Sequence, residues 1–165
     1  MARSGTFAGV IVSMMLMTGC ASLNYDLSAQ DAVGSWSAGG DSPLRLDVRA
    51  DGTFQATGWP SNAWCEGRST PRTVNDLRID ETRSFSGTWT FVESSGPDSI
   101  RFTREDGDDC SVGTAADFWE EGGITYACFP LPGVTVDAKG VENLIVIYRD
   151  EPIEPSRADS CFNYN

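Results

Sequence analysis

The side chains of this sequence that can do acid–base chemistry are almost all carboxylates. There are 24 Asp and Glu against 12 Lys and Arg, and there is no His, which gives a net charge of -12 at pH 7. Without His, the Ser-His-Asp and Cys-His nucleophilic systems and all histidine metal sites are excluded. A Ser–Lys system would depend on Lys139, the sole lysine, in the turn-like segment Asp137–Gly140. No P-loop and no G-x-S-x-G occurs, so we expect no catalytic residue and no cofactor.

The carboxylates leave two kinds of site to consider. Paired carboxylates could form a hydrolase centre acting on the cell envelope, and this alternative stays open because no motif marks a pair. The acidic run Glu105-Asp106-Gly107-Asp108-Asp109 offers oxygen ligands of the kind that calcium prefers. Its spacing is not that of an EF-hand, and an Asp-Gly pair is typical of a solvated hairpin tip. We therefore assign no metal ligand.

The first 19 residues have the features of an export signal. Arg3 precedes an apolar run from Phe7 to Met17, which is shorter than the roughly 20 residues that cross a bilayer. The run ends in Leu16-Met17-Thr18-Gly19-Cys20, which resembles the lipobox of bacterial lipoproteins, with Met17 where Leu, Val or Ile is more usual. The resemblance implies cleavage before Cys20, acylation of Cys20 and anchoring at the extracytoplasmic face of the cell membrane.

The mature chain implied by this cleavage is strongly acidic. Loss of Arg3 leaves 11 basic and 24 acidic residues, a net charge of -13. This excludes non-specific affinity for nucleic acid and a polybasic patch on anionic lipid. Residues 20–32 are polar and without periodicity, which predicts a lipidated tether reaching up to about 40 Å. Residues 33–165 are then long enough for a single domain with its own core.

Four further cysteines follow Cys20, at Cys65, Cys110, Cys128 and Cys161. No CxxC pair occurs and the spacings are wide, which argues against a zinc site. An even number in an exported chain predicts two disulfides, with three pairings open. We favour Cys110–Cys128, which closes a short loop, together with Cys65–Cys161, which holds the C-terminus.

Hydropathy alternation predicts an all-β fold. Apolar residues alternate with polar ones over Leu44–Val48 and Phe54–Ala56, on either side of Asp51-Gly52, which predicts a hairpin. Many short strands with frequent turns indicate a small antiparallel barrel or sandwich, braced by disulfides. Further strands are expected at 84–92, 100–103, 124–129, 144–148 and 161–164, and one helical turn at 115–121.

An internal echo favours a duplicated β unit. Seven residues between Arg49 and Gly67 recur 55 residues later between Arg104 and Gly122, with Trp64 matched by Trp119. Upstream, Gly34-Ser35-Trp36 recurs as Gly87-Thr88-Trp89, 53 residues on. Two similar segments would then pack together to close one sheet system.

The motifs Gly34-Ser35-Trp36 and Asp51-Gly52-Thr53-Phe54-Gln55-Ala56-Thr57-Gly58 resemble a set of small actinobacterial lipoproteins. Their cores read G-[ST]-W and D-G-T-F-x-A-T-G, and the likeness covers most of residues 33–165. It implies an extracytoplasmic location and a β fold, and it implies no activity. The G-x-W at 34–36 also resembles the lipocalin motif, whose Trp packs across one end of the barrel. The other lipocalin motifs are missing, so no lipocalin ligand site is implied.

The five tryptophans are the remaining candidates for a contact. Trp36 and Trp89 follow Gly at strand starts, which predicts core positions. Trp59 and Trp64 flank a loop, where aromatic faces can contact a sugar or a protein, with structural packing as the alternative. We therefore expect a tethered binding or interaction module whose ligand is an envelope component or protein. The alternatives are the carboxylate hydrolase and a purely structural envelope protein.

The anchor gives the first testable prediction. Cys20→Ala removes the only thiol in the lipobox-like segment, so the protein should appear in the medium or accumulate as uncleaved precursor. Metabolic labelling with a radioactive fatty acid measures this directly, with the unsubstituted chain as control. Label retained by the Cys20→Ala protein would contradict lipidation at this residue.

Overall fold

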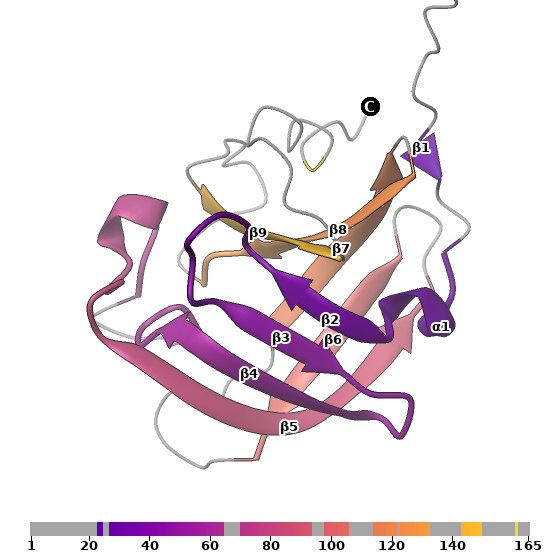
Figure 1. Cartoon of the computed structure of the whole chain (residues 1–165), viewed down its shortest axis with the longest axis horizontal. Coiled ribbons are helices and arrows are strands. Elements are labelled where there is room, and N and C mark those ends of the chain that lie inside the picture. Colours follow the sequence, from indigo (N-terminus) through magenta and orange to yellow (C-terminus); the bar gives the residue numbers. More distant parts are fainter. Residues whose placement is uncertain are drawn as a thin grey trace, which may run out of the picture.

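The computed structural model describes residues 23–24, 27–64, 70–93, 98–105, 114–121, 123–132, 143–149 and 161. In that part of the chain, eight antiparallel strands form a closed barrel, and each strand pairs with the next one along the chain (Figure 1). The predicted all-β barrel is therefore confirmed. The eight strands are β2 (Gly34–Ser37), β3 (Arg45–Val48), β4 (Thr53–Pro60), β5 (Thr82–Val92), β6 (Ser99–Arg104), β7 (Thr114–Glu121), β8 (Ile124–Pro130) and β9 (Leu144–Arg149).

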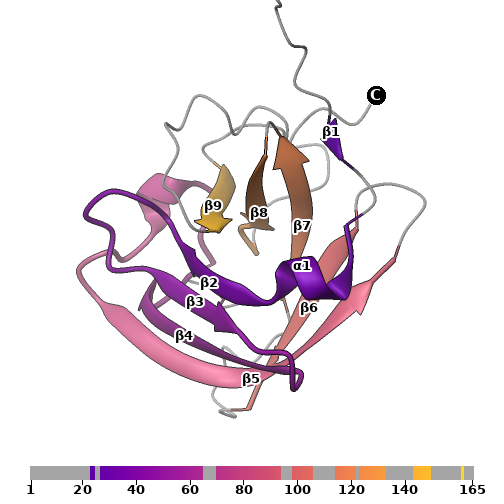
Figure 2. The ribbon, with the colours of Figure 1, turned by 45° about the vertical axis from the view of Figure 1, so that its right-hand side comes forward.

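Three short elements accompany the barrel. β1 (Leu23–Asn24) pairs with the end of β7, α1 (Ala29–Ala32) leads into β2, and η1 (Val74–Asp76) lies between β4 and β5. Figures 1 and 2 show α1 beside the start of β2, whereas η1, the pink coil at the left of Figure 1, lies at the other end of the barrel. We call these the α1 end and the η1 end. Among the described residues, no helix is long and apolar enough to cross a membrane.

The first hairpin forms as predicted from its alternation. Val48 pairs with Phe54 and Leu46 with Ala56, and all four side chains are buried. The turn between them needs Gly52, whose φ of +85° is accessible to glycine at little cost. The Asp51 carboxylate accepts hydrogen bonds from the backbone N–H and the hydroxyl of Thr53 at 3.0 and 2.6 Å. The expected strands over 84–92, 100–103, 124–129 and 144–148 are likewise present.

A bulge in β4 decides on which side of the barrel wall Trp59 lies. The register shifts between Ala56 and Trp59, and Gly58 adopts φ +67° there. Strict alternation from Phe54 and Ala56 would point Trp59 outward, but the extra residue turns its side chain inward. A Cβ on Gly58 would collide with the Pro43 carbonyl, so only glycine permits this close approach of β4 to the β2–β3 connection.

Two apolar clusters lie on opposite faces of the sheet. The interior cluster includes Trp36 and Trp89, which confirms both as core residues. A smaller cluster lies on the outer face of β7, β8 and β9, since its members alternate with interior residues along those strands. Its fully or nearly buried members are Trp119, Tyr126, Cys128, Tyr148 and Cys161.

The disulfide in the structure joins Cys128 to Cys161, with their Cα atoms 6.2 Å apart. Both favoured pairings, Cys110–Cys128 and Cys65–Cys161, are therefore wrong. Cys128 points to the outer face of β8, where the outer cluster packs against Cys161, so its partner follows from side-chain direction and not from loop length. Cys65 and Cys110 lie outside the described residues.

Three other predictions are corrected by the structure. The segment 115–121 is not a helical turn, because it pairs with β6 on one side and with β8 on the other. The tether predicted over 20–32 is wrong for residues 23–24 and 27–32: β1 pairs with β7, and Leu27 and Ala32 are buried. Cys161, the first residue of the expected last strand, is not in a strand, and residues 162–165 lie outside the described residues.

The internal echo is only partly matched in space. Arg49 directly follows β3, the first strand of the β3–β4 pair, and Arg104 ends β6, the first strand of the β6–β7 pair. The two arginines therefore stand in nearly equivalent positions. Trp64 lies in the turn after β4, whereas Trp119 lies within β7 on its outer face. The matched tryptophans thus do not occupy equivalent places.

The disulfide gives a prediction about stability. Cys128 and Cys161 are separated by 33 residues. In the chain-entropy model, losing a cross-link over a loop of this length lowers the free energy of unfolding by about 3–4 kcal/mol. Urea unfolding of the double variant Cys128→Ala/Cys161→Ala, compared with the unsubstituted chain, measures the loss. Mass spectrometry without reduction should yield the Cys128–Cys161 peptide pair, and a pair joining Cys110 to Cys128 would contradict the structure.

Candidate functional site

The interior of the barrel is filled by aromatic rings, and the filling is completed by Trp64. This residue follows β4 in the connection to β5, yet only 4% of it is exposed. Its ring centroid lies 4.7 Å from that of Phe85 on β5 and 5.9 Å from those of Phe102 on β6 and Phe129 on β8. Trp64 therefore reaches from a connection into the centre of the barrel and contacts strands on several sides.

The interior tryptophans differ in how their indole N–H groups are satisfied. Trp59 Nε1 donates to the Arg45 carbonyl at 2.9 Å, and Trp36 Nε1 donates to the Ala32 carbonyl at 3.0 Å. Trp89 Nε1 donates to the Arg49 carbonyl at 2.8 Å. Trp64 Nε1 is buried with no hydrogen-bond partner among the described residues. The indoles of Trp36, Trp59 and Trp89 thus each donate a hydrogen bond to a backbone carbonyl. In the described residues, the indole of Trp64 is held by ring packing only.

These positions overturn the predicted contact at Trp59 and Trp64. Trp59 is fully buried, and the two rings pack edge to face with centroids 5.2 Å apart inside the barrel. Neither presents a face to a partner from solvent, so an exposed aromatic contact at these residues is wrong. The physical reasons are the β4 bulge, which turns Trp59 inward, and the interior volume, which Trp64 fills.

An apolar pocket opens instead at the η1 end, where the barrel closes only briefly. β9 pairs with β2 only at Ser37↔Tyr148 and Trp36↔Arg149, after which the β2–β3 connection leaves the edge of β9. We call the opening between them the seam pocket, and its volume is about 240 Å³. Its lining is Ala38, Ser42, Pro43, Leu44, Gly58, Pro60, Val74, Leu77, Ile79, Thr82, Leu144, Ile145 and Val146.

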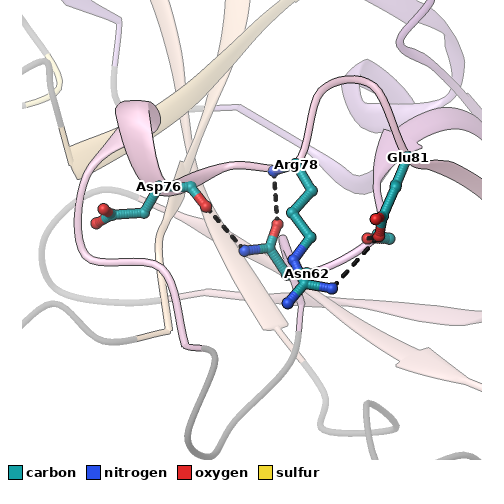
Figure 3. A network of polar contacts seen from close by, with 5 residues as sticks. Asn62, Asp76, Arg78 and Glu81 are labelled. Carbon is teal, nitrogen blue, oxygen red and sulfur yellow. Dashed lines mark hydrogen bonds and ion pairs between the residues drawn. The ribbon is translucent and has the colours of Figure 1, made fainter.

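The outer wall of the seam pocket is the segment around η1, which Asn62 fixes in place. Asn62 is buried, and its Nδ2 donates to the Asp76 carbonyl at 2.9 Å while its Oδ1 accepts from the Arg78 backbone N–H at 3.0 Å (Figure 3). A surface ion pair between Arg78 and Glu81, at 3.3 Å, closes the same segment. Asn62 stands two residues before Trp64, so a single turn both holds the pocket wall and fills the barrel.

A second amide and a carboxylate support this wall. Asn143, directly before β9, donates from Nδ2 to the Arg72 carbonyl at 2.6 Å. Hydrogen bonds from the backbone of Thr73, then of Arg72, hold the pKa of Asp76 below its ordinary value of 3.8. The stabilisation from this carboxylate is therefore present at neutral pH and is lost as the pH falls through its lowered pKa.

The carboxyls with shifted pKa values accept hydrogen bonds in local turns. Hydrogen bonds from the Ser28 side chain and backbone lower the pKa of Asp31, and those from the Thr53 side chain and backbone lower the pKa of Asp51. With Asp76, all three favour the ionised form, whereas a general acid working near neutral pH needs a raised pKa. Over the described ranges, no group of three His, Cys, Asp or Glu side chains could hold a metal ion. Residues 106–109 of the acidic run lie outside those ranges.

Comparison with known proteins identifies no relative. No protein-family model, curated protein or solved structure matches this chain. The chemistry of the seam pocket must therefore be argued from its own residues.

The seam pocket was not anticipated from the sequence, although one signal for it exists. Val74, Leu77 and Ile79 are apolar residues in an otherwise polar segment that shows no strand alternation. Ile79 is 74% exposed and Val74 36% exposed. Isolated apolar residues at a surface are common, so only their position around a pocket gives them meaning.

The contrast between the two packed indoles gives a prediction. Trp59→Phe and Trp64→Phe remove the same atoms from the same cluster, but only Trp59→Phe leaves a backbone carbonyl, that of Arg45, without its donor. Trp59→Phe should therefore lower the free energy of unfolding by about 1–3 kcal/mol more than Trp64→Phe does. Urea unfolding of the two variants measures the difference. Equal losses would show that the Trp59 hydrogen bond does not contribute to stability.

Proposed function

We propose that the protein is a lipid-anchored extracytoplasmic module that binds a small apolar group of its ligand in the seam pocket. The observation that carries this proposal is the pocket itself, an apolar opening with large exposed side chains at its rim. Among the described residues, aromatic rings fill the barrel interior, so it offers no second site for a ligand. The lipobox-like segment ending at Cys20 supports the location.

The lining of the pocket defines the chemistry of the occupant. Among the described residues that line it, none is charged, and Ser42 and Thr82 supply the only side-chain hydroxyls. Pockets that bury a drug-sized ligand run to about 300–1,000 Å³. At about 240 Å³, the seam pocket suits one neutral apolar group, such as a large side chain or a fragment of similar size.

The exposed rim gives a reason for binding. Ile79 is 74% exposed and Val74 36% exposed, and both line the pocket. Covering such residues removes apolar surface from water, and complete burial of an Ile or Val side chain contributes about 1.5–3 kcal/mol. Asn62 and Asn143 hold this wall in place before the occupant arrives, which lowers the ordering cost of binding.

A charged residue at the rim should abolish this binding without affecting the fold. Ile79→Asp places a carboxylate at an exposed pocket position, so affinity for the neutral probe 1-naphthylamine should fall at least tenfold. Thr90→Asp, on an exposed outer position of β5, is the matched control and should bind as the unsubstituted chain does. Fluorescence titration measures the affinities, and circular dichroism checks the fold. Equal affinity in all three proteins would contradict binding in the seam pocket.

A further inference from the structure

Within the described ranges, the strand that borders the seam pocket has an edge that is unpaired over part of its length. β9 pairs with β8 from Leu144 to Tyr148, but with β2 only at Tyr148 and Arg149. Over Leu144–Ile147, the edge that faces the β2–β3 connection has no strand partner in the part of the chain that the structure describes. Backbone donors and acceptors on such an edge are a template for another extended chain.

The composition of this edge does not protect it. Natural sheets block exposed edges with Lys, with Pro or with inward charges, and Leu144-Ile145-Val146-Ile147 contains none of these. Ile145 and Ile147 point into the barrel, while Leu144 and Val146 are half-buried on the other face. Leu144, Ile145 and Val146 also line the seam pocket, so the free backbone edge and the apolar pocket are one continuous surface.

We propose that an extended peptide segment of an exported protein adds as a strand to the edge of β9 and places one apolar side chain in the seam pocket. This proposal rests on the proposed function and specifies its ligand. A peptide is the ligand class that satisfies both features, because its backbone pairs with the strand edge and its alternate side chains enter a pocket. A lipid or a small hydrocarbon would fill the pocket and leave the edge unpaired.

The position of the edge relative to the anchor indicates where the peptide comes from. Cys20 is three residues before Leu23, and three extended residues span at most about 11 Å. Leu23 pairs with Glu121 at the α1 end, whereas Leu144 pairs with Pro130 at the η1 end. An acyl chain on Cys20 would thus hold the α1 end next to the bilayer, and the seam would face the aqueous side. Figure 1 shows β1 and α1 on one side of the barrel and η1 on the other. The exposed Ile79 and Val74 are then out of reach of the membrane and available to a soluble partner.

The test uses the purified full chain and two sets of probes. The first set consists of labelled, capped peptides of alternating Thr and Val with Leu, Ile, Phe or Trp at the centre. The second set has the same sequences with alternate backbone nitrogens methylated, which removes strand donors and keeps the side chains. Fluorescence anisotropy measures affinity, and hydrogen exchange resolved by residue follows the amides of Leu144–Ile147.

We expect at least one unmodified peptide to bind, its methylated counterpart to bind at least tenfold more weakly, and the seam-facing amides of Leu144–Ile147 to become protected. Ile79→Asp should weaken binding of the unmodified peptide at least tenfold, and Thr90→Asp should not.

Equal binding of both peptide sets, or binding of 1-naphthylamine alone, would overturn strand addition and leave the proposed function standing. Protection of the seam-facing amides before any peptide is added would show that this chain already covers the edge, which also overturns the proposal. If the unsubstituted chain binds neither the peptides nor 1-naphthylamine, the proposed function itself is overturned.

Discussion

Side chains must fill the interior of the barrel for its strands to close around a packed core. Eight strands enclose a space that side chains can just fill, and here aromatic rings take most of it. The strands alone do not complete the packing, because Trp64 enters from the connection after β4. The β4 bulge contributes in the same way by turning Trp59 inward. Because Trp64 completes the interior, the turn that carries it is buried at Asn62, Ala63 and Trp64.

Because side chains fill the interior, the pocket of the barrel lies at its rim. The turn that carries Trp64 also carries Asn62, whose amide holds the η1 segment over the seam. Packing in the core and the shape of the pocket are therefore coupled through two residues of one turn. The short pairing between β2 and β9 leaves the opening, and the close approach of Pro43 to Gly58 sets its far side.

The two ends of the barrel have different roles in this arrangement. At the α1 end, β1 pairs with β7, and Arg149 Nη1 donates to the Asp31 carbonyl at 2.8 Å, so the N-terminal segment is tied to the last strand. At the η1 end, amide and carboxylate caps hold an apolar wall open to solvent. The proposed anchor at Cys20 lies toward the α1 end and the proposed peptide edge toward the η1 end, so the two proposals place binding away from the membrane.

Features that depend on local periodicity could be predicted from the amino-acid sequence. Alternation around Asp51-Gly52 determined the β3–β4 hairpin, and the Gly-x-Trp pattern pointed to core positions for Trp36, in β2, and Trp89, in the middle of β5. The tertiary structure decided the features for which two segments compete. A one-residue bulge reversed the side of Trp59, pairing on both edges made 114–121 a strand, and the outward direction of Cys128 chose Cys161 as its partner. The seam pocket depends on where β2 leaves β9, which is a property of strand closure. The apolar residues of the η1 segment do not by themselves locate it, because its walls come from residues between Ala38 and Val146 that meet only when the barrel closes.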